Sequence, residues 1–298
     1  MVKKNRIGIL GIGAIGSVIA SLLHQTAAYK LHYYHRSIKK NIKISVDNKT
    51  ITIPIRTETS VDSAPDLDWL LICLKEHHYA TATHWFEKLI GPKTNVAIIR
   101  NGINLKEPLL PFTPEENMVE CMIDCPVQPS ENGYYRQLKK PMITVPANAL
   151  AITFQSLFDA HQCQVTISST FKTESWKKLC ESATLGAILC LSGETCWIFK
   201  DKKLQLLYRN ILRETVQVAI ADGANIEENT FIDEMLTKLL RYPNNKGSSM
   251  LTDRLNGKPI ELGAKNGIIA KLATQYHLKT PLNDLITILL THTNFGNS

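Results

Sequence analysis

Three glycines at fixed spacing near the start of the chain, Gly11, Gly13 and Gly16, have the pattern of a phosphate-binding turn. They follow a short apolar run and precede residues that are apolar at helical spacing, which is the strand, turn and helix order of a dinucleotide-binding fold. Gly11 would make the tight turn, Gly13 would let a pyrophosphate approach the backbone, and Gly16 would let helix and strand pack closely. We therefore expect Gly11-Ile12-Gly13-Ala14-Ile15-Gly16 to hold a dinucleotide, and a glycine turn without a ligand is the alternative.

Polar residues follow the next predicted strands, where open α/β sheets bind their ligands. Arg36 comes after the second strand, at the position that selects the cofactor. An acidic residue there would bind the ribose of NAD, whereas the planar guanidinium of arginine suits the extra phosphate of NADP. Arg36 therefore favours NADPH, against the alternative of a solvated loop arginine. Lys75 and Asn101 follow the strands at 69–74 and 96–99 and are expected at the same edge.

Two patterns of hydrophobic residues divide the chain. The first part alternates strands and helices, which predicts an α/β Rossmann domain with a doubly wound, mostly parallel sheet over residues 1–170. From residue 171 to 298 helical periodicity dominates, which predicts an all-α C-terminal domain. Strands are expected at 7–10, 30–34, 42–46, 50–53, 69–74, 96–99, 119–123, 134–138, 142–145 and 164–167, with 42–46 and 50–53 forming a hairpin. Helices are expected after Gly13 and at 79–90, 149–161, 173–191, 203–222, 230–240, 249–255, 261–276 and 281–290.

The composition excludes several classes of protein. With 298 residues, 44% hydrophobic and 20% charged, the chain can bury two cores. No apolar run reaches the length of a membrane span, so no membrane partner is expected. Seven cysteines without a C-x-x-C pair predict reduced thiols in a cytoplasmic protein, and no metal site. The net charge of +7 is spread without a basic block, so no nucleic-acid partner is expected either.

Several motifs together resemble those of the ketopantoate reductase (2-dehydropantoate 2-reductase) family. In chain order they are the glycine turn at 11–16, Arg36, Leu74-Lys75, Asn101-Gly102, Trp176-Lys177-Lys178-Leu179, Ser248-Ser249-Met250 with Asp253, and Gly257-Lys258-Pro259-Ile260-Glu261. Each motif is common alone, but their order and spacing are specific, and the resemblance covers nearly the whole chain. It implies an N-terminal Rossmann domain that binds NADPH, a helical C-terminal domain, and a small 2-oxo acid as the substrate.

The resemblance also implies a role for five residues. Lys178 would hydrogen-bond the ketone oxygen and supply the proton as hydride arrives, which neutralises the alkoxide that hydride addition creates. Glu261 would orient this lysine, and Ser249 would hold the substrate carboxylate. Asn101 would lie between cofactor and substrate, and Lys75 near the nicotinamide ribose. Simpler roles stay open: a solvated lysine, a helical pair of Glu261 with the lysine four residues later, a helix cap at Ser249, and a turn at Asn101.

Some positions depart from the family pattern. The family usually carries asparagines four and eight residues after the catalytic lysine, where this chain has Ser182 and Gly186. Gly263 replaces an aspartate of the last motif, and Arg100 replaces a glutamine. Ser182 is expected to contact the substrate with a shorter reach than asparagine, and Gly186 to leave the surface beside Lys178 wider and less polar. This predicts weakened activity on ketopantoate.

The function predicted from these residues is NADPH-dependent reduction of a 2-oxo acid to a 2-hydroxy acid. Ketopantoate, which would give pantoate for pantothenate biosynthesis, is the first candidate substrate. Two alternatives stay open: a non-catalytic NADPH-binding sensor or interaction protein, and an opine-type imine reductase. The sequence does not determine the oligomeric state, and it is compatible with a homodimer.

Overall fold

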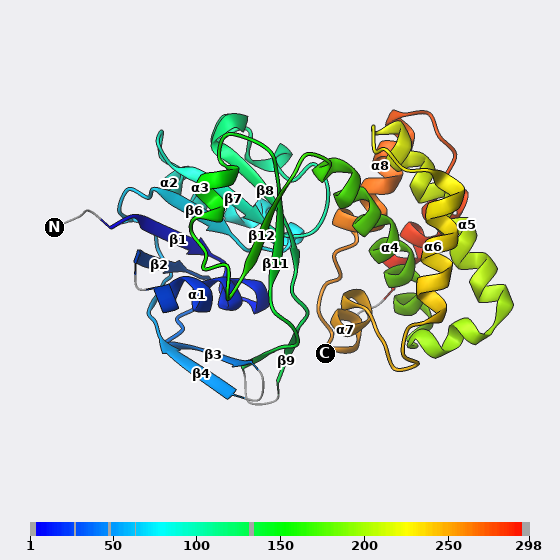
Figure 1. The fold of residues 1–298 in the computed structure, drawn as a ribbon, viewed down its shortest axis with the longest axis horizontal. Helices are drawn as coiled ribbons and strands as arrows, with labels where there is room; N and C mark the ends of the chain where they lie inside the picture. The colour runs from blue at the N-terminus through cyan, green and yellow to red at the C-terminus, as the bar shows by residue number, and fades with distance from the viewer. Residues whose placement is uncertain (1–3, 27, 47–48, 63, 131–133, 294–298) are drawn as a thin grey trace. The chain divides into compact units, whose positions relative to one another are not determined.

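A computed structural model describes residues 4–26, 28–46, 49–62, 64–130 and 134–293. The chain forms two compact units, Met1–Phe171 and Lys172–Ser298. In Figure 1 the first unit runs from blue to green and the second from green to red. The first is an α/β unit and the second is helical, as the sequence predicts.

The first unit is built on an eight-stranded sheet in the order β12-β11-β8-β7-β6-β1-β2-β5. From β5 to β8 every neighbouring pair is parallel, and β11 runs antiparallel to β8. The strands are β1 (Arg6–Leu10), β2 (Lys30–Tyr34), β5 (Thr57–Glu58), β6 (Trp69–Ile72), β7 (Asn95–Ile99), β8 (Met118–Asp124), β11 (Met142–Pro146) and β12 (Gln164–Ser168). The central strands are continuous apolar runs because both faces of the sheet are buried.

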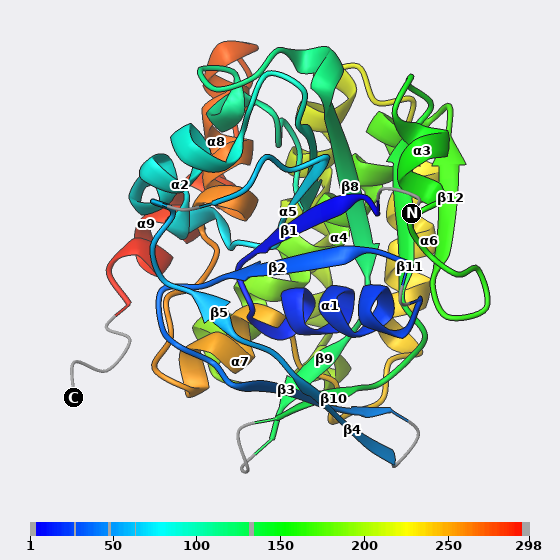
Figure 2. The same cartoon turned by 90° about the vertical axis from the view of Figure 1, so that its left-hand side faces the viewer.

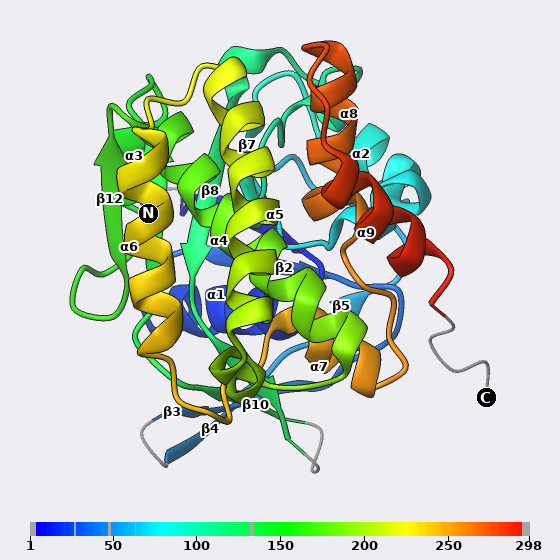
Figure 3. The ribbon, with the colours of Figure 1, turned by 90° about the vertical axis from the view of Figure 1, so that its right-hand side faces the viewer.

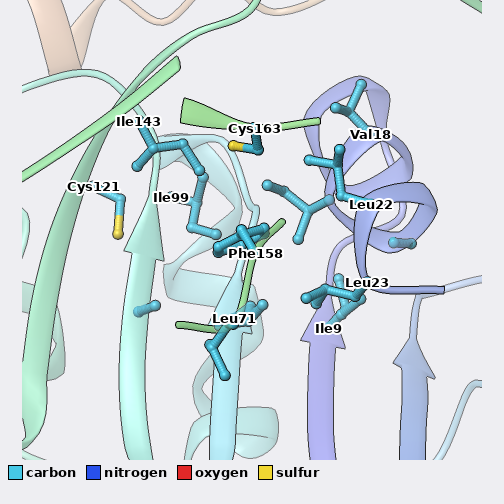
Figure 4. Packing of buried hydrophobic residues seen from close by; sticks show 14 of the residues in the cluster. Ile9, Val18, Leu22, Leu23, Leu71, Ile99, Cys121, Ile143, Phe158 and Cys163 are labelled. Atoms are coloured by element: carbon cyan, nitrogen blue, oxygen red, sulfur yellow. The ribbon is translucent and has the colours of Figure 1, made fainter. Parts of the chain in front are cut away.

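Helices cover both faces of this sheet. The unit's α-helices are α1 (Ala14–Thr26), α2 (Thr83–Leu89) and α3 (Ala151–Gln155). Helices α1 and α3 contribute to one buried cluster and α2 to the other, so the sheet is doubly wound as predicted. Figure 4 shows the first cluster, in which Ile9 of β1 lies beside Leu23 of α1 and Ile99 of β7 lies near Phe158.

A second, smaller sheet packs against α1. Its order is β4-β3-β10-β9, with β3 (Asn41–Val46), β4 (Lys49–Pro54), β9 (Val127–Pro129) and β10 (Tyr135–Gln137). The predicted hairpin is confirmed as the antiparallel pair β3 and β4. The sequence did not predict that β10 would pair with β3, far away in the chain. Figure 2 shows α1 between the two sheets.

Two helices of this unit are shorter than predicted. The segment expected at 79–90 contains two 3-10 turns, η1 (Glu76–His78) and η2 (Ala80–Ala82), before α2 begins at Thr83. The hydroxyls of Thr81 and Thr83 donate to carbonyl oxygens three residues earlier, at 3.0 and 3.1 Å, and so favour tight turns. In the segment expected at 149–161, α3 ends at Gln155, and the Ser156 hydroxyl donates to the Thr153 carbonyl oxygen at 2.7 Å.

The second unit contains only helices in its described part. They are α4 (Phe171–Ser192, which begins one residue before the unit), η5 (Cys196–Lys200), α5 (Lys202–Ala221), α6 (Glu228–Leu240), α7 (Ser249–Leu255), η6 (Gly263–Gly267), α8 (Ile268–Gln275) and α9 (Pro281–Thr291). Figure 3 shows α5 beside α6 and close to α9. Helix α5 ends before Gly223, whose φ of 93° is the left-handed conformation that glycine adopts freely after a helix.

The predicted helix at 261–276 is interrupted. Residues Gly263–Gly267 form a π-helical turn, η6, and the α-helix α8 begins only at Ile268. The Gly267 N–H donates to the Leu262 carbonyl oxygen, five residues back, at 2.9 Å. A π-helical turn inserts one extra residue per turn and redirects the side chains it carries. Among the described residues, no helix combines the length and apolar composition that crossing a membrane requires.

Candidate active site

The glycine turn between β1 and α1 has the backbone that a bound pyrophosphate needs. Gly11 has a φ of 95°, and its N–H donates to the Tyr34 carbonyl oxygen at 2.9 Å. A Cβ on Gly16 would lie 1.8 Å from the Gly11 carbonyl oxygen, so only glycine fits there. A Cβ on Gly13 would meet none of the described residues within 4 Å, which leaves the turn open on that side. This geometry fits a dinucleotide whose phosphates approach the turn and the start of α1.

Basic side chains surround the loop that follows β2. Arg36 is exposed, as a residue that meets a ligand phosphate would be. The Lys39 ammonium donates to the carbonyl oxygen of Ile12 at 2.6 Å, and burial lowers the pKa of Lys39. Lys39 was not among the predicted cofactor-binding residues. The lysines that closely follow Arg36 in the sequence could have indicated it. A small pocket beside the turn is lined by Ile12, Ser17, Lys39, Lys40, Asn41, Ile42, Lys43 and Tyr135.

His35 lies in the same loop and is half-buried. Burial, with the positive charges of Lys39 and Arg36, lowers the pKa of His35 to about 4. Its Nδ1 accepts the backbone N–H of Ser37 at 3.1 Å. At neutral pH this imidazole is therefore uncharged, and the positive charge of the loop comes from Arg36 and the lysines.

Lys75 and Asn101 lie just beyond the ends of β6 and β7, which are parallel neighbours. Lys75 is half-buried, and its charge partly offsets the effect of burial, which raises the pKa of Tyr135. The Asn101 side-chain oxygen accepts the Ile123 N–H at 3.1 Å. This bond fixes the side chain against β8 and directs the amide N–H groups, which are donors, away from that strand.

Helix α4 carries Lys178. Two residues before Lys178, Trp176 binds the buried carboxylate of Asp222. The indole N–H of Trp176 donates to Asp222 at 2.8 Å. The same carboxylate accepts the Tyr276 hydroxyl at 2.7 Å and lies 3.1 Å from the Lys172 ammonium. Lys178 is half-buried, which distinguishes it from the exposed lysine that follows Trp176.

The neighbouring Lys177 is in a different environment. It is exposed, and its ammonium lies 5.7 Å from the centre of the Phe231 ring. Adjacent helical residues point about 100° apart around the helix axis. The two lysines therefore serve as a matched pair for experiments on the predicted proton donor.

The two serines at the start of α7 have separate roles. Ser248 is the helix cap, because its hydroxyl oxygen accepts the Leu251 N–H at 3.1 Å. Ser249 does not cap the helix, so capping does not explain this serine. Its hydroxyl oxygen instead accepts a hydrogen bond from the Lys265 ammonium at 3.1 Å.

Glu261 is half-buried and precedes the π-helical turn η6. The alternative role for Glu261 assumed an α-helix from 261 onward, in which a lysine four residues later would lie on the same face. Because the α-helix begins only at Ile268, that geometry does not apply. The role of Glu261 in orienting Lys178 stays a prediction.

Two family models account for most of the chain. Residues 7–149 match the ketopantoate reductase PanE/ApbA model, and residues 170–294 match the model of its C-terminal part. The chain belongs to the ketopantoate reductase family.

The relatives and solved structures support this assignment. The chain is 28% identical to the 2-dehydropantoate 2-reductase of Caulobacter vibrioides, over 95% of this chain and 97% of that protein. A dimeric ketopantoate reductase from Staphylococcus aureus superposes with a TM-score of 0.87 at 24% identity, covering 98% and 100% of the two chains. A D-mandelate dehydrogenase solved with NADH and anilino(oxo)acetate superposes with a TM-score of 0.85 at 17% identity, covering 96% and 97%. These two structures share its fold.

As a member of the ketopantoate reductase family, the protein is an oxidoreductase that acts on CH–OH groups. Members of the ketopantoate reductase family use a nicotinamide dinucleotide as their cofactor. In the part of the chain that the structure describes, no three His, Cys, Asp or Glu side chains gather as a metal site would require.

The ketopantoate reductase pattern changes most around Gly186. The prediction that this glycine leaves a wider, less polar surface is wrong. A Cβ on Gly186 would lie 2.9 Å from the Met250 sulfur and 3.8 Å from the Lys265 ammonium, so a thioether and a cation occupy this region. The Ser182 hydroxyl lies 3.4 Å from the Leu179 carbonyl oxygen of its own helix. The contacts of Gly186 could not be found from sequence spacing, because Met250 and Lys265 come from distant segments.

Arg100, which replaces a glutamine of the ketopantoate reductase pattern, packs within the first unit. Its guanidinium carbon lies 4.9 Å from the centre of the Tyr79 ring, a cation–π distance. This contact anchors the residue before Asn101 to the α2 side of the sheet.

Proposed function

We propose that the protein reduces a 2-oxo acid to a 2-hydroxy acid with NADPH, and that ketopantoate is the first candidate substrate. The observation that carries the proposal is the half-buried Lys178 on α4, a helix fixed by the Trp176–Asp222 hydrogen bond. A sensor that only binds the cofactor would need no proton donor on a fixed helix. The open glycine turn supports the cofactor part of the proposal.

When bound, NADPH supplies the hydride that reduces the ketone carbon. The residues of this chain would bind the substrate and deliver the proton. Lys178 would donate a hydrogen bond to the ketone oxygen and transfer that proton as negative charge develops, which contributes typically 10²- to 10⁴-fold to the rate. Glu261 would orient Lys178, Asn101 would donate to the substrate through its amide, and Ser249 and Ser182 would bind the substrate's polar groups.

The preference for NADPH over NADH is the second part of the proposal. Arg36 is supported in this role by its exposure in the loop after β2, because Lys39 of the same loop donates to the Ile12 carbonyl oxygen of the glycine turn. Lys75 would lie at the nicotinamide ribose, since it follows β6 at the edge where the sheet binds ligands. The D-mandelate dehydrogenase with the same fold was solved with NADH, so the fold alone does not decide between the two nucleotides.

Absorbance of NADPH at 340 nm tests the proposal. The purified protein is mixed with NADPH and, in turn, ketopantoate, other branched and aromatic 2-oxo acids, and the same acids with an amine. Oxidation of NADPH by a 2-oxo acid alone supports the reductase. A strict requirement for the amine would indicate an opine-type imine reductase, and tight NADPH binding without oxidation by any acid would indicate a sensor. For ketopantoate, a kcat/KM near or above about 10⁵ M⁻¹s⁻¹ would contradict the predicted weak activity.

The biological setting is proposed on the same basis. With ketopantoate as the substrate, the reaction would supply pantoate for pantothenate, and expression of the gene would rescue a pantoate-requiring bacterial mutant. All seven cysteines are free thiols, which supports the proposed location in the cytoplasm.

A homodimer is proposed from apolar side chains exposed on two packed helices. They are Leu206 and Leu207 on α5 and Leu285, Ile288 and Leu289 on α9. Exposed apolar side chains on neighbouring helices can form an interface, and a ketopantoate reductase of the same fold is dimeric. Light scattering after gel filtration measures the assembly directly, and a monomer at micromolar concentration would contradict the proposal.

A further inference from the structure

Gly186 marks a point where three segments of the second unit meet. The glycine is buried on α4, two helical turns beyond Lys178. The contacts that a Cβ would make come from Met250 on α7 and Lys265 on η6. A Cβ at position 186 would overlap the Met250 sulfur at 2.9 Å, and it would lie in ordinary van der Waals contact with the Lys265 ammonium at 3.8 Å. The Lys265 ammonium therefore lies beside α4 at this glycine.

Lys265 holds the hydroxyl of Ser249. The ammonium donates to the Ser249 oxygen at 3.1 Å, so the hydroxyl proton is directed to a different acceptor. An ammonium has three N–H donors, which allows it to bind Ser249 and other acceptors together. Ser249 is exposed and Lys265 is half-buried, so this pair presents two adjacent donors at the surface of the unit.

The backbone conformation around Lys265 also favours a functional role for this residue. Lys265 lies in the π-helical turn η6, and turns of this kind occur often at functional sites. The residue two positions earlier is Gly263, where the family pattern has an aspartate.

Arg254, another basic residue of this unit, has different hydrogen-bond partners from Lys265. Arg254 donates to the Cys190 carbonyl oxygen and, at 3.1 Å, to the Leu191 carbonyl oxygen, so it serves the end of α4. Arg254, Lys265 and Asp253 all act electrostatically on the Cys190 thiol, whose pKa burial raises. Lys265 is thus the cation that bonds directly to the predicted carboxylate-binding serine.

We propose that Lys265 and Ser249, beside Gly186, together form a subsite for the carboxylate of the 2-oxo acid. The proposal rests on the proposed function and names Lys265 as a specificity-determining residue. The ammonium would select anionic 2-oxo acids over neutral 2-oxo esters. Because the carboxylate keeps its charge throughout the reaction, Lys265 stabilises the bound substrate and the transition state alike, and its loss raises KM without lowering kcat.

The test compares 3,3-dimethyl-2-oxobutanoate, the ketopantoate skeleton without its hydroxyl, with the methyl ester of the same acid. For Lys265→Met we expect the KM of the acid to rise roughly 10- to 100-fold, the range for a hydrogen bond to a charged group. The kcat of the acid, and the kcat/KM of the ester, should change less than about threefold. Lys265→Arg should restore part of the affinity for the acid. Lys271→Met, an exposed lysine of α8, is the matched control and should change neither.

Binding gives a second result that does not depend on turnover. Oxalate titrated into the wild-type protein with NADP⁺ should bind, and Lys265→Met should weaken it by a similar factor while Lys271→Met does not. Equal loss of activity on acid and ester, or unchanged oxalate binding, would overturn the proposal. Oxalate binding that depends on Lys265, in a wild-type protein that reduces no 2-oxo acid, would support the subsite and overturn the proposed function.

Discussion

The glycine turn of the first unit and the residues of the second unit that we propose to bind the substrate differ in how they are built. The turn is one continuous segment of six residues whose backbone makes the site, and its geometry follows from where the glycines lie. In the second unit, the residues around Gly186 come from α4, α7 and η6, and their side chains determine its surroundings. A backbone site tolerates little change in sequence, whereas a site made of side chains from separate helices changes when one residue is replaced. The chain departs from its family in the second region and keeps the pattern in the first.

The largest effect is expected at the predicted proton donor. Lys178→Ala should lower kcat by roughly 10²- to 10⁴-fold, because the alkoxide it neutralises forms only in the transition state. The dissociation constant of NADPH should hardly change, since the cofactor-binding residues lie in the other unit. Steady-state rates and fluorescence titration of NADPH measure the two quantities. Lys177→Ala is the control, and equal losses in the two variants would show that Lys178 has no special role.

The glycine turn offers two contrasting substitutions. Gly13→Ala adds a methyl group where none of the described residues lies within 4 Å, so it should leave the melting temperature of the protein unchanged. The same methyl group should obstruct the phosphates and weaken NADPH binding, by about 100-fold if it displaces one charged hydrogen bond. Gly16→Ala should lower both stability and binding, because its methyl group would overlap the Gly11 carbonyl oxygen. Unimpaired NADPH binding by Gly13→Ala would place the cofactor elsewhere.

The cofactor preference depends on a side chain and should change independently of the turn. Arg36→Ala should reduce the preference for NADPH over NADH roughly 10- to 100-fold, the range for a charge-assisted bond to phosphate. NADH binding should stay the same, because NADH lacks this phosphate. Dissociation constants of both nucleotides give the ratio. A ratio that does not change would transfer the role to Lys39 or Lys40.

The smallest expected effect is on the stability of the protein, and it tests whether Asp222 holds α4 in place. Asp222→Ala would leave the indole N–H of Trp176 without its acceptor, and it should lower the free energy of unfolding by about 1–3 kcal/mol. Urea titration measures this loss. Asp222→Asn, which keeps one acceptor oxygen, should lose less, and equal stability of all three proteins would show that this carboxylate does not hold the helix.

Asp222 also predicts a pH dependence. Burial alone would raise the pKa of Asp222, but hydrogen bonds from Tyr276, Trp176 and Lys172 outweigh burial and lower the pKa. The folded protein therefore keeps this carboxylate ionised at a pH where the unfolded chain begins to protonate it. Its contribution to stability is present above the ordinary aspartate pKa of about 3.9 and is lost as the pH falls through the lower, folded value. The difference in stability between the wild type and Asp222→Asn should narrow over this acidic range.

Local sequence patterns predicted most of the fold. The second strand and α7 begin and end at the predicted residues, because each is a short run bounded by clear turn or capping signals. The second sheet was predicted only as a hairpin, since the pairing of β10 with β3 joins segments about 90 residues apart. The π-helical turn was missed because a one-residue insertion hardly disturbs the apolar periodicity on which the helix prediction rested.

The site was predictable to different extents in the two units. The tight turn at Gly11 and the close packing at Gly16 were predicted correctly, because backbone geometry follows directly from where glycine is required. The environment of Gly186 was predicted wrongly, because a missing side chain indicates space only if no other residue fills it. Met250 and Lys265 fill it, and tertiary contacts of this kind leave no trace in the spacing of residues along the chain.

The two supports of α4 have a mechanical consequence. Asp222 holds the helix near its beginning through Trp176, and Arg254 holds its last carbonyl groups. Because these contacts hold α4 near both ends, we expect Lys178 to keep its position along the helix axis when neighbouring side chains are exchanged. Selection for a new substrate could therefore act on α7 and the π-helical turn one residue at a time, while the chemical step is inherited unchanged.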